Sequence, residues 1–236
     1  MTGQVGAPGG KGSDWTVRRL RRRWKPTKER LSNANELPEI RIRIHRCCSW
    51  LQRVEALAVE GTTSSDETLV FQWIGFNALY GRWNADRREP IAEHDAIDQF
   101  VEQILAIDES GHIRSVLDQH KKLAMALFDN SYLNRYFWKD PSKERARRTE
   151  KAKFNAQGWY VQGDYTLILS GLLERIHFLR CQLVHGASTH NGKLNRTAVQ
   201  HCSTMLGHLL PALLLALIDH GHAEDWGPLC YPPLND

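Results

Sequence analysis

Apolar residues recur every three or four positions along most of the chain, which is the spacing of one face of an α-helix. The segment 39–60, for example, places Trp50, Leu51, Val54 and Leu57 on one stripe. The same periodicity predicts further helices over 67–83, 91–110, 112–129, 164–186 and 195–222. We find neither strand-like alternation nor an internal repeat in the sequence. The pattern therefore predicts an all-α fold, a helical bundle of four or five core helices with antiparallel neighbours and extra peripheral helices.

Two of these segments differ from the amphipathic rest. The segment 67–83 is apolar nearly all round, which indicates a central helix covered by its neighbours. The segment 195–222 holds the longest apolar run, which is shorter than the ~20 residues that a membrane span needs. It also contains Pro211, which should kink or break the helix. The charged stretch 139–153 is typical of a solvated helix or an excursion from the bundle.

Positive charge is concentrated near the N-terminus. The chain has a formal net charge of +4, but residues 18–30 hold eight basic residues and one acid, a net of +7, which leaves −3 for the rest. We interpret residues 1–36 as a basic, flexible arm and residues 37–236 as the helical domain.

The arm has two interpretations. Arg21, Arg22 and Arg23, with Trp15 and Trp24 close in sequence, are suited to binding phosphates and stacking on bases, which predicts contact with RNA. The alternative is a solubilising leader behind a Gly-rich start. In neither case do we expect the active site there.

Cysteine usage and metal-ligand spacing set the expected compartment and cofactors. The five cysteines form no CxxC pair, their number is odd, and no secretory signal precedes them. Reduced thiols in a cytoplasmic protein are therefore expected, with no membrane association. His220, His222 and Cys230 are zinc-ligand types, but no fourth ligand stands at standard spacing. We expect neither a metal site nor a cofactor.

The end of the segment 164–186 carries the residues that suggest chemistry, in the stretch FLRCQLVHG. Arg180 and His185 are five positions apart, which in a helix means ~140° of rotation and ~7.5 Å of rise, so they do not share one face. Gly186 is a natural residue to follow a helix, and it places His185 at the helix end. An arginine can stabilise charge on phosphoryl oxygens while a histidine moves protons, so this pair suits metal-free phosphodiester chemistry. The alternative is simply a polar helix end.

Two stretches in this order resemble a known family. RCQLVH, followed by glycine, resembles the R-x4–6-H signature of the HEPN superfamily of all-helical domains, which includes Apea-like and related defence groups. The earlier FQWIGFNALYGRW is similar to an aromatic core helix with the pattern W-x-[AG]-F-N-x-L-Y in several HEPN groups. The resemblance covers about residues 40–222.

The resemblance implies a function and a mechanism. In catalytically active HEPN ribonucleases, the motif Arg and His cleave RNA without metal through attack of the ribose 2′-OH, which leaves a 2′,3′-cyclic phosphate. These proteins form two-fold dimers that bring two motifs into one cleft. The resemblance therefore implies a homodimeric endoribonuclease with Arg180 and His185 as catalytic residues. It also suggests a role in bacterial defence or toxin-type growth arrest, with an antitoxin or sensor protein as a possible partner.

This sequence departs from the family pattern after the motif arginine. Many active members have a polar residue there, often Asn or Asp, whereas this chain has Cys181, a poor hydrogen-bonding substitute. Ala187 stands where one toxin subgroup has a tyrosine, so control by modification of that tyrosine is not expected. The alternative function is a non-catalytic helical module that binds nucleotide, RNA or a partner protein.

Four further residues are candidate RNA contacts. Asn77 lies within the apolar segment 67–83, where it either faces the cleft or is a hydrogen-bonded core asparagine. Arg82, Lys193 and Arg196 are suited to binding RNA phosphates near the motif, and the alternative for each is a solvated surface position.

Overall fold

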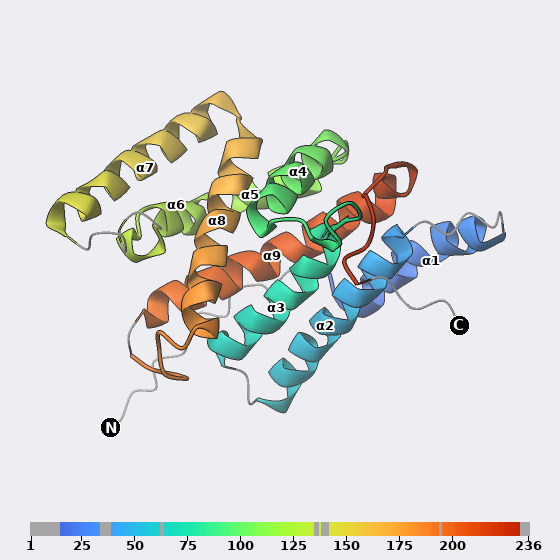
Figure 1. The fold of residues 1–236 in the computed structure, drawn as a ribbon, viewed down its shortest axis with the longest axis horizontal. Helices are drawn as coiled ribbons and strands as arrows, with labels where there is room; N and C mark the ends of the chain where they lie inside the picture. The colour runs from blue at the N-terminus through green and yellow to red at the C-terminus, as the bar shows by residue number, and fades with distance from the viewer. Residues whose placement is uncertain are drawn as a thin grey trace, which may run out of the picture.

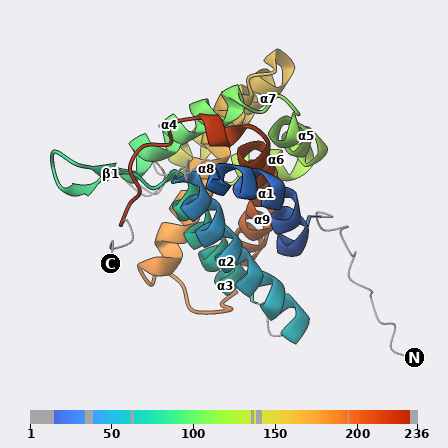
Figure 2. The same cartoon turned by 90° about the vertical axis from the view of Figure 1, so that its right-hand side faces the viewer.

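The computed structural model describes residues 15–33, 39–61, 64–134, 137, 142–193 and 195–231, and within them the predicted all-α fold is confirmed (Figure 1). The helices are α1 (Val17–Asn33), α2 (Ile40–Glu60), α3 (Ser65–Tyr80), α4 (Glu93–Ala106), α5 (His112–Gln119), α6 (Lys121–Phe128), α7 (Lys143–Gln162), α8 (Tyr165–Val184) and α9 (Arg196–His220). Strands β1 (Trp83–Asn84) and β2 (Glu89–Pro90) form an antiparallel hairpin, which projects from the helical body in Figure 2. The hairpin was not predicted, because two-residue strands are too short to show alternation.

Helix α9 is the centre of the bundle. It packs against α1, α3, α5, α6 and α8, and it crosses the middle of the molecule in Figure 1. Every residue from Leu209 to Ile218 is buried. By length and composition alone the segment 196–223 could cross a membrane, but 78% of its apolar window is buried inside the fold, as expected of a core helix.

Helix α9 continues through Pro211. Of the two predicted effects of this proline, a kink or a break, the break is therefore wrong. A proline inside a helix removes one hydrogen bond and costs about 3 kcal/mol. The helix is packed into the core on both sides of Pro211, and each large buried aliphatic side chain contributes about 1.5–3 kcal/mol. Burial of this apolar run therefore outweighs the cost of the proline.

Helix α3 has the central position that its composition predicts. Ser64 caps its first turn, since the Ser64 hydroxyl accepts from the Glu67 N–H while the Glu67 carboxylate accepts from the Ser64 N–H. Helices α2, α4, α8 and α9 all contact it. Gly75 faces α2, where a Cβ would lie 3.4 Å from the Trp50 Cβ, at van der Waals contact. The large buried side chains of α3 are Leu69, Trp73, Phe76, Leu79 and Tyr80.

The basic segment corrects the prediction of a flexible arm. Residues 17–33 form α1, which packs against α9 and α2, and its buried side chains are Val17, Leu20, Trp24 and Leu31. The Arg23 guanidinium donates to both carboxylate oxygens of Asp219, each at 2.7 Å. The high charge of this segment conceals an apolar stripe at helical spacing, which explains the incorrect prediction. Residues 1–14 and 34–36 of the predicted arm lie outside the described residues.

Other boundaries differ from the periodicity. The predicted helix 112–129 is divided at His120 into α5 and α6. The imidazole of His120 stacks on that of His208 in α9, with ring centroids 3.7 Å apart. Residues 143–153 of the charged stretch form the first part of α7, which continues to Gln162. Of the two alternatives for this stretch, the helical one is correct for residues 143–153.

A buried arginine fastens the end of α3 to the segment that follows α9. Arg43 of α2 is 1% exposed, and its guanidinium donates to the carbonyl oxygens of Leu79 and Gly81 at 3.0 and 2.6 Å. It also donates to the carbonyl oxygens of Trp226 and Gly227 at 3.0 and 2.9 Å. Burial lowers the pKa of Arg43 to about 10, which leaves the side chain charged at neutral pH. The carbonyl dipoles therefore stabilise a buried positive charge.

We expect Arg43→Met to lower the free energy of unfolding by about 2–4 kcal/mol, because it leaves several buried carbonyl groups without a donor. Arg53→Met is the matched control, since Arg53 is exposed on the same helix and pairs with Glu60 at 3.2 Å. That change should stay within about 0.5 kcal/mol. Urea unfolding followed by circular dichroism measures both, and equal losses would contradict the structural role of Arg43.

Candidate functional site

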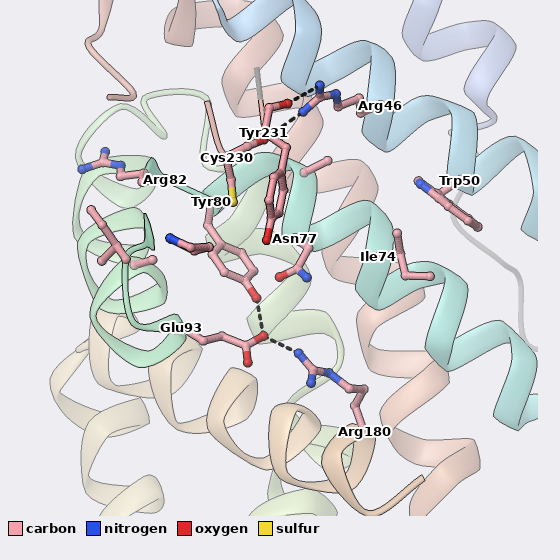
Figure 3. A pocket seen from close by; sticks show the side chains of 15 residues that line it. Arg46, Trp50, Ile74, Asn77, Tyr80, Arg82, Glu93, Arg180, Cys230 and Tyr231 are labelled. Carbon is pink, nitrogen blue, oxygen red and sulfur yellow. Dashed lines mark hydrogen bonds and ion pairs between the residues drawn. The ribbon is translucent and has the colours of Figure 1, made fainter. Parts of the chain in front are cut away.

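Arg180 lines an open pocket of about 600 Å³ (Figure 3). Its walls come from α2, the second half of α3, the start of α4, α8 and the segment after α9. Asn77 and Arg82, two of the predicted RNA contacts, line the same pocket. Candidate residues from two distant parts of the sequence therefore lie around one cavity.

The Glu93 carboxylate joins three helices at the inner wall of this pocket. Its Oε1 accepts from the Tyr80 hydroxyl at 2.7 Å and from the Trp73 Nε1–H at 3.3 Å, both on α3. The same oxygen accepts from Arg180 Nη2 on α8, and the His177 Nδ1 lies 3.4 Å from Oε2. Figure 3 shows the Tyr80 hydroxyl above the carboxylate and the Arg180 guanidinium to its right.

This cluster determines the charge state of Glu93. Burial raises the pKa of the carboxyl, but the neighbouring His177, the hydrogen bond from Tyr80 and the charge of Arg180 outweigh it, and the pKa is about 2. Burial and the neighbouring carboxylate raise the pKa of Tyr80, which therefore remains a neutral donor. Glu93 is thus a fixed anion that orients Arg180.

Arg180 is held on two further sides. Its guanidinium lies over the Trp73 ring, with Cζ 5.1 Å from the ring centroid, and its side chain is 16% exposed. Nη1 lies 3.7 Å from Cys181 Sγ, while Nε has no hydrogen-bond partner among the described residues. The guanidinium is consequently fixed in place, with one buried N–H that has no partner among the described residues.

Two other arginines line the pocket without a carboxylate partner in the described part of the chain. Arg82 donates to the side-chain carbonyls of Gln99 and Gln103 at 3.0 and 2.7 Å. Arg46 donates to the backbone carbonyls of Cys230 and Tyr231 at 3.2 and 2.9 Å. Neutral acceptors orient both side chains without cancelling their charge, so the pocket is suited to an anion.

Aromatic surface accompanies these cations. Tyr231, 69% exposed, extends over the pocket in Figure 3, and its ring centroid is 5.8 Å from that of Trp83. Trp50 lines the α2 side and stacks on Phe71 at 5.6 Å. Cationic side chains next to an exposed aromatic face are the combination that binds the phosphate and the base of a nucleotide.

His185 ends α8 as predicted, but it does not meet Arg180 within the described chain. The helix stops at Val184, His185 is the capping position, and Gly186 adopts a left-handed φ of 71°. His185 is exposed and is not part of the pocket lining. The imidazole and the guanidinium thus leave α8 in different directions, as their ~140° offset requires.

The structure places the predicted RNA contacts in different surroundings. Asn77 is exposed, so the interpretation as a buried core asparagine is wrong. The Arg196 guanidinium is not free to bind a phosphate, because it pairs with Asp66 of α3 and donates to the Asn191 side chain at 3.0 Å. Lys193 is exposed in the loop between α8 and α9. On α1, Arg22 is exposed and Arg21 lines a different groove.

The three residues of zinc-ligand type near the C-terminus do not form one cluster. His222 Nε2 lies 3.0 Å from an Arg30 nitrogen, whereas Cys230 lines the pocket. Among the described residues, no three side chains of His, Cys, Asp or Glu are grouped so that they could hold a metal ion.

Sequence reasoning missed the acidic and aromatic members of the site. Glu93 stands 87 residues before Arg180, and periodicity does not reveal a contact across that separation. His177 had a detectable signal, since it precedes Arg180 by three positions and therefore lies one turn away on the same helix. Tyr80 and Trp73 belong to the motif that resembles the HEPN core helix.

Comparisons with protein-family models, with curated proteins and with solved structures find no match for this chain. Functional inference accordingly depends on the geometry and on the motif resemblance. The geometry provides a fixed guanidinium, two further cations, an exposed amide and aromatic surface around one pocket, which together can bind a phosphate-bearing aromatic ligand.

The pKa of Glu93 predicts a pH dependence of stability. The carboxyl has a pKa of about 2 in the folded chain against an ordinary 4.5, so the unfolded chain binds the proton more tightly. The stabilisation is complete above the ordinary value and is lost as the pH falls toward 2. Glu93→Gln should lower the free energy of unfolding at neutral pH by about 1–3 kcal/mol. The difference from wild type should shrink between about pH 5 and pH 2.

Chemical denaturation across this pH range measures the effect. Glu102→Gln is the control, because Glu102 is exposed on the same helix. It should leave the free energy of unfolding almost unchanged at every pH. A Glu93→Gln deficit that did not vary with pH would contradict an ionised, stabilising carboxylate.

Proposed function

We propose that this chain is a metal-independent endoribonuclease in which Arg180 and His185 are the catalytic residues. The observation that supports it most is the position of Arg180 in a pocket with two arginines that have no carboxylate partner among the described residues. The HEPN-like motif supplies the second argument. It also suggests a role in bacterial defence or growth arrest, with a possible antitoxin or sensor partner.

In the proposed reaction, the ribose 2′-oxygen attacks the adjacent phosphorus. The 2′-O–P bond forms while the P–O5′ bond breaks, and the products are a 2′,3′-cyclic phosphate and a free 5′-hydroxyl. A neutral His185 accepts the 2′-hydroxyl proton and, once protonated, donates a proton to the leaving 5′-oxygen. Arg180 stabilises the charge that accumulates on the phosphoryl oxygens, for which its planar fork is well suited.

A homodimer would bring the imidazole of one copy to the Arg180 of the other. Arg180 is directed toward Glu93, whereas His185 is exposed at the end of α8. If two copies pack their α8 ends around a two-fold axis, each Arg180 can act with the imidazole of the other copy. The dimer is therefore part of the proposal.

One observation favours a second candidate, a non-catalytic module that binds nucleotide or RNA. Glu93 holds Arg180 in an ion pair, which reduces the positive charge available to a transition state. Cys181 offers only a thiol to Arg180 and His177, whose Nε2 lies 3.4 Å away from its Sγ. Such a module would bind RNA in the pocket and leave it intact.

Incubation of the protein with single-stranded RNA in EDTA distinguishes the candidates. We expect cleavage to continue in EDTA with cyclic phosphate ends. His185→Ala should slow it by about 10²–10⁴-fold. Arg180→Lys keeps a cation beside Glu93 but loses the fork, and it should slow cleavage by about 10²-fold or more. His201→Ala on α9, outside the pocket lining, is the control and should be as active as wild type.

Mixing the two inactive variants tests the dimer. Mixed dimers contain an intact Arg180 on one chain and an intact His185 on the other, so part of the activity should return if the pair forms across the interface. A mixture that stays inactive would exclude that pairing. RNA that is bound but never cut by the wild type would favour the binding module, and loss of cleavage in EDTA would indicate a metal nuclease instead.

A further inference from the structure

Helices α1 and α2 enclose a second groove, of about 410 Å³. The α2 residues that line it lie about 200° around the helix from those that line the Arg180 pocket. The two cavities therefore open on opposite faces of α2. The floor of the groove is apolar, formed in part by the buried Trp24 and Ile44.

Basic side chains occupy both walls of this groove. Arg21, Lys25 and Lys28 stand on one stripe of α1 at steps of four and three residues, so their rises along the axis are about 6 and 4.5 Å. Arg41 and His45 face them from α2. The groove is thus lined by a short row of positive charge rather than by an isolated cation.

Little negative charge offsets this row. Among the described residues, Glu29 is the only carboxylate in the lining, and it lies 3.7 Å from Lys25 in an exposed pair. Cys48 is also present, but burial raises the pKa of its thiol to about 11, so it contributes no negative charge at neutral pH. Like charges at these spacings repel one another, and a bound anion would relieve that repulsion.

Other basic residues of α1 have different roles. Arg23 is paired with Asp219 and Arg30 contacts His222, so that stripe fastens α1 to the end of α9. Arg18 and Arg22 are exposed and do not line the groove. The charge of α1 is consequently divided between a stripe that holds the fold together and a stripe directed into the groove.

We propose that the groove between α1 and α2 binds a run of consecutive phosphate groups. A chain of phosphates matches a row of cations spaced at about 5 Å, because each phosphate can contact one or two of these side chains. The phosphates belong either to a free polyphosphate or to the backbone of a single-stranded RNA. The proposal does not depend on catalysis at Arg180, because the two cavities are separate.

Calorimetric titration with inorganic tripolyphosphate and with a short oligouridylate tests the proposal. The double variant Lys28→Gln/Arg41→Gln removes one cation from each wall. The control Arg18→Gln/Arg22→Gln removes the same charge from the outer face of α1. We expect the groove variant to weaken binding by about tenfold or more and the control by about twofold at most. The charge-preserving Lys28→Arg/Arg41→Lys should retain binding, which shows that the fold tolerates changes at these positions.

The two probes distinguish the source of the phosphates. Groove-dependent binding of tripolyphosphate supports a free polyphosphate ligand. Groove-dependent binding of the oligouridylate alone supports an RNA backbone, and its salt slope should decrease by about 0.7 for each lost cation. Equal weakening by the groove and control variants, or no binding of either probe, would overturn the proposal. Neither outcome depends on whether RNA is cleaved.

Discussion

The contact on which the Arg180 pocket depends is the cluster around the Glu93 carboxylate. A carboxylate removed from water is costly unless donors replace its hydration. Here Tyr80, Trp73 and Arg180 supply donors from two other helices, and His177 lies beside the second oxygen. The contacts that stabilise the Glu93 charge also fix the position of the Arg180 guanidinium. The same cluster therefore contributes both to stability and to the arrangement of the pocket.

The opposite wall of the pocket depends on a second buried charge. Arg43 holds Trp226 and Gly227 against the end of α3, and Arg46 continues this attachment to Cys230 and Tyr231. Both arginines come from the first two turns of α2, and both donate to backbone carbonyls. These interactions hold the opposite wall in place without a carboxylate. The arginines therefore keep the pocket positively charged.

The sequence predicted what periodicity and local rules control. The apolar repeats of α2, α3 and α9 gave the fold class, and Gly186 located the end of α8, because each feature acts within a few residues. Prediction failed where distant contacts decide. The apolar stripe of α1 was obscured by its arginines, and the cluster at Glu93 depends on partners brought together only by the tertiary fold. Asn77 and Arg82 were identified as candidates, but only the structure gathers them with Arg180.

The central claim is that Glu93 and Arg180 are energetically coupled, so that the carboxylate positions the guanidinium in the pocket. A double-mutant cycle with Glu93→Gln, Arg180→Met and the combined variant measures this coupling from the free energies of unfolding at neutral pH. The contact predicts a coupling energy of about 1–3 kcal/mol, with the double variant less destabilised than the sum of the single variants. Additive losses, with a coupling below about 0.3 kcal/mol, would contradict it.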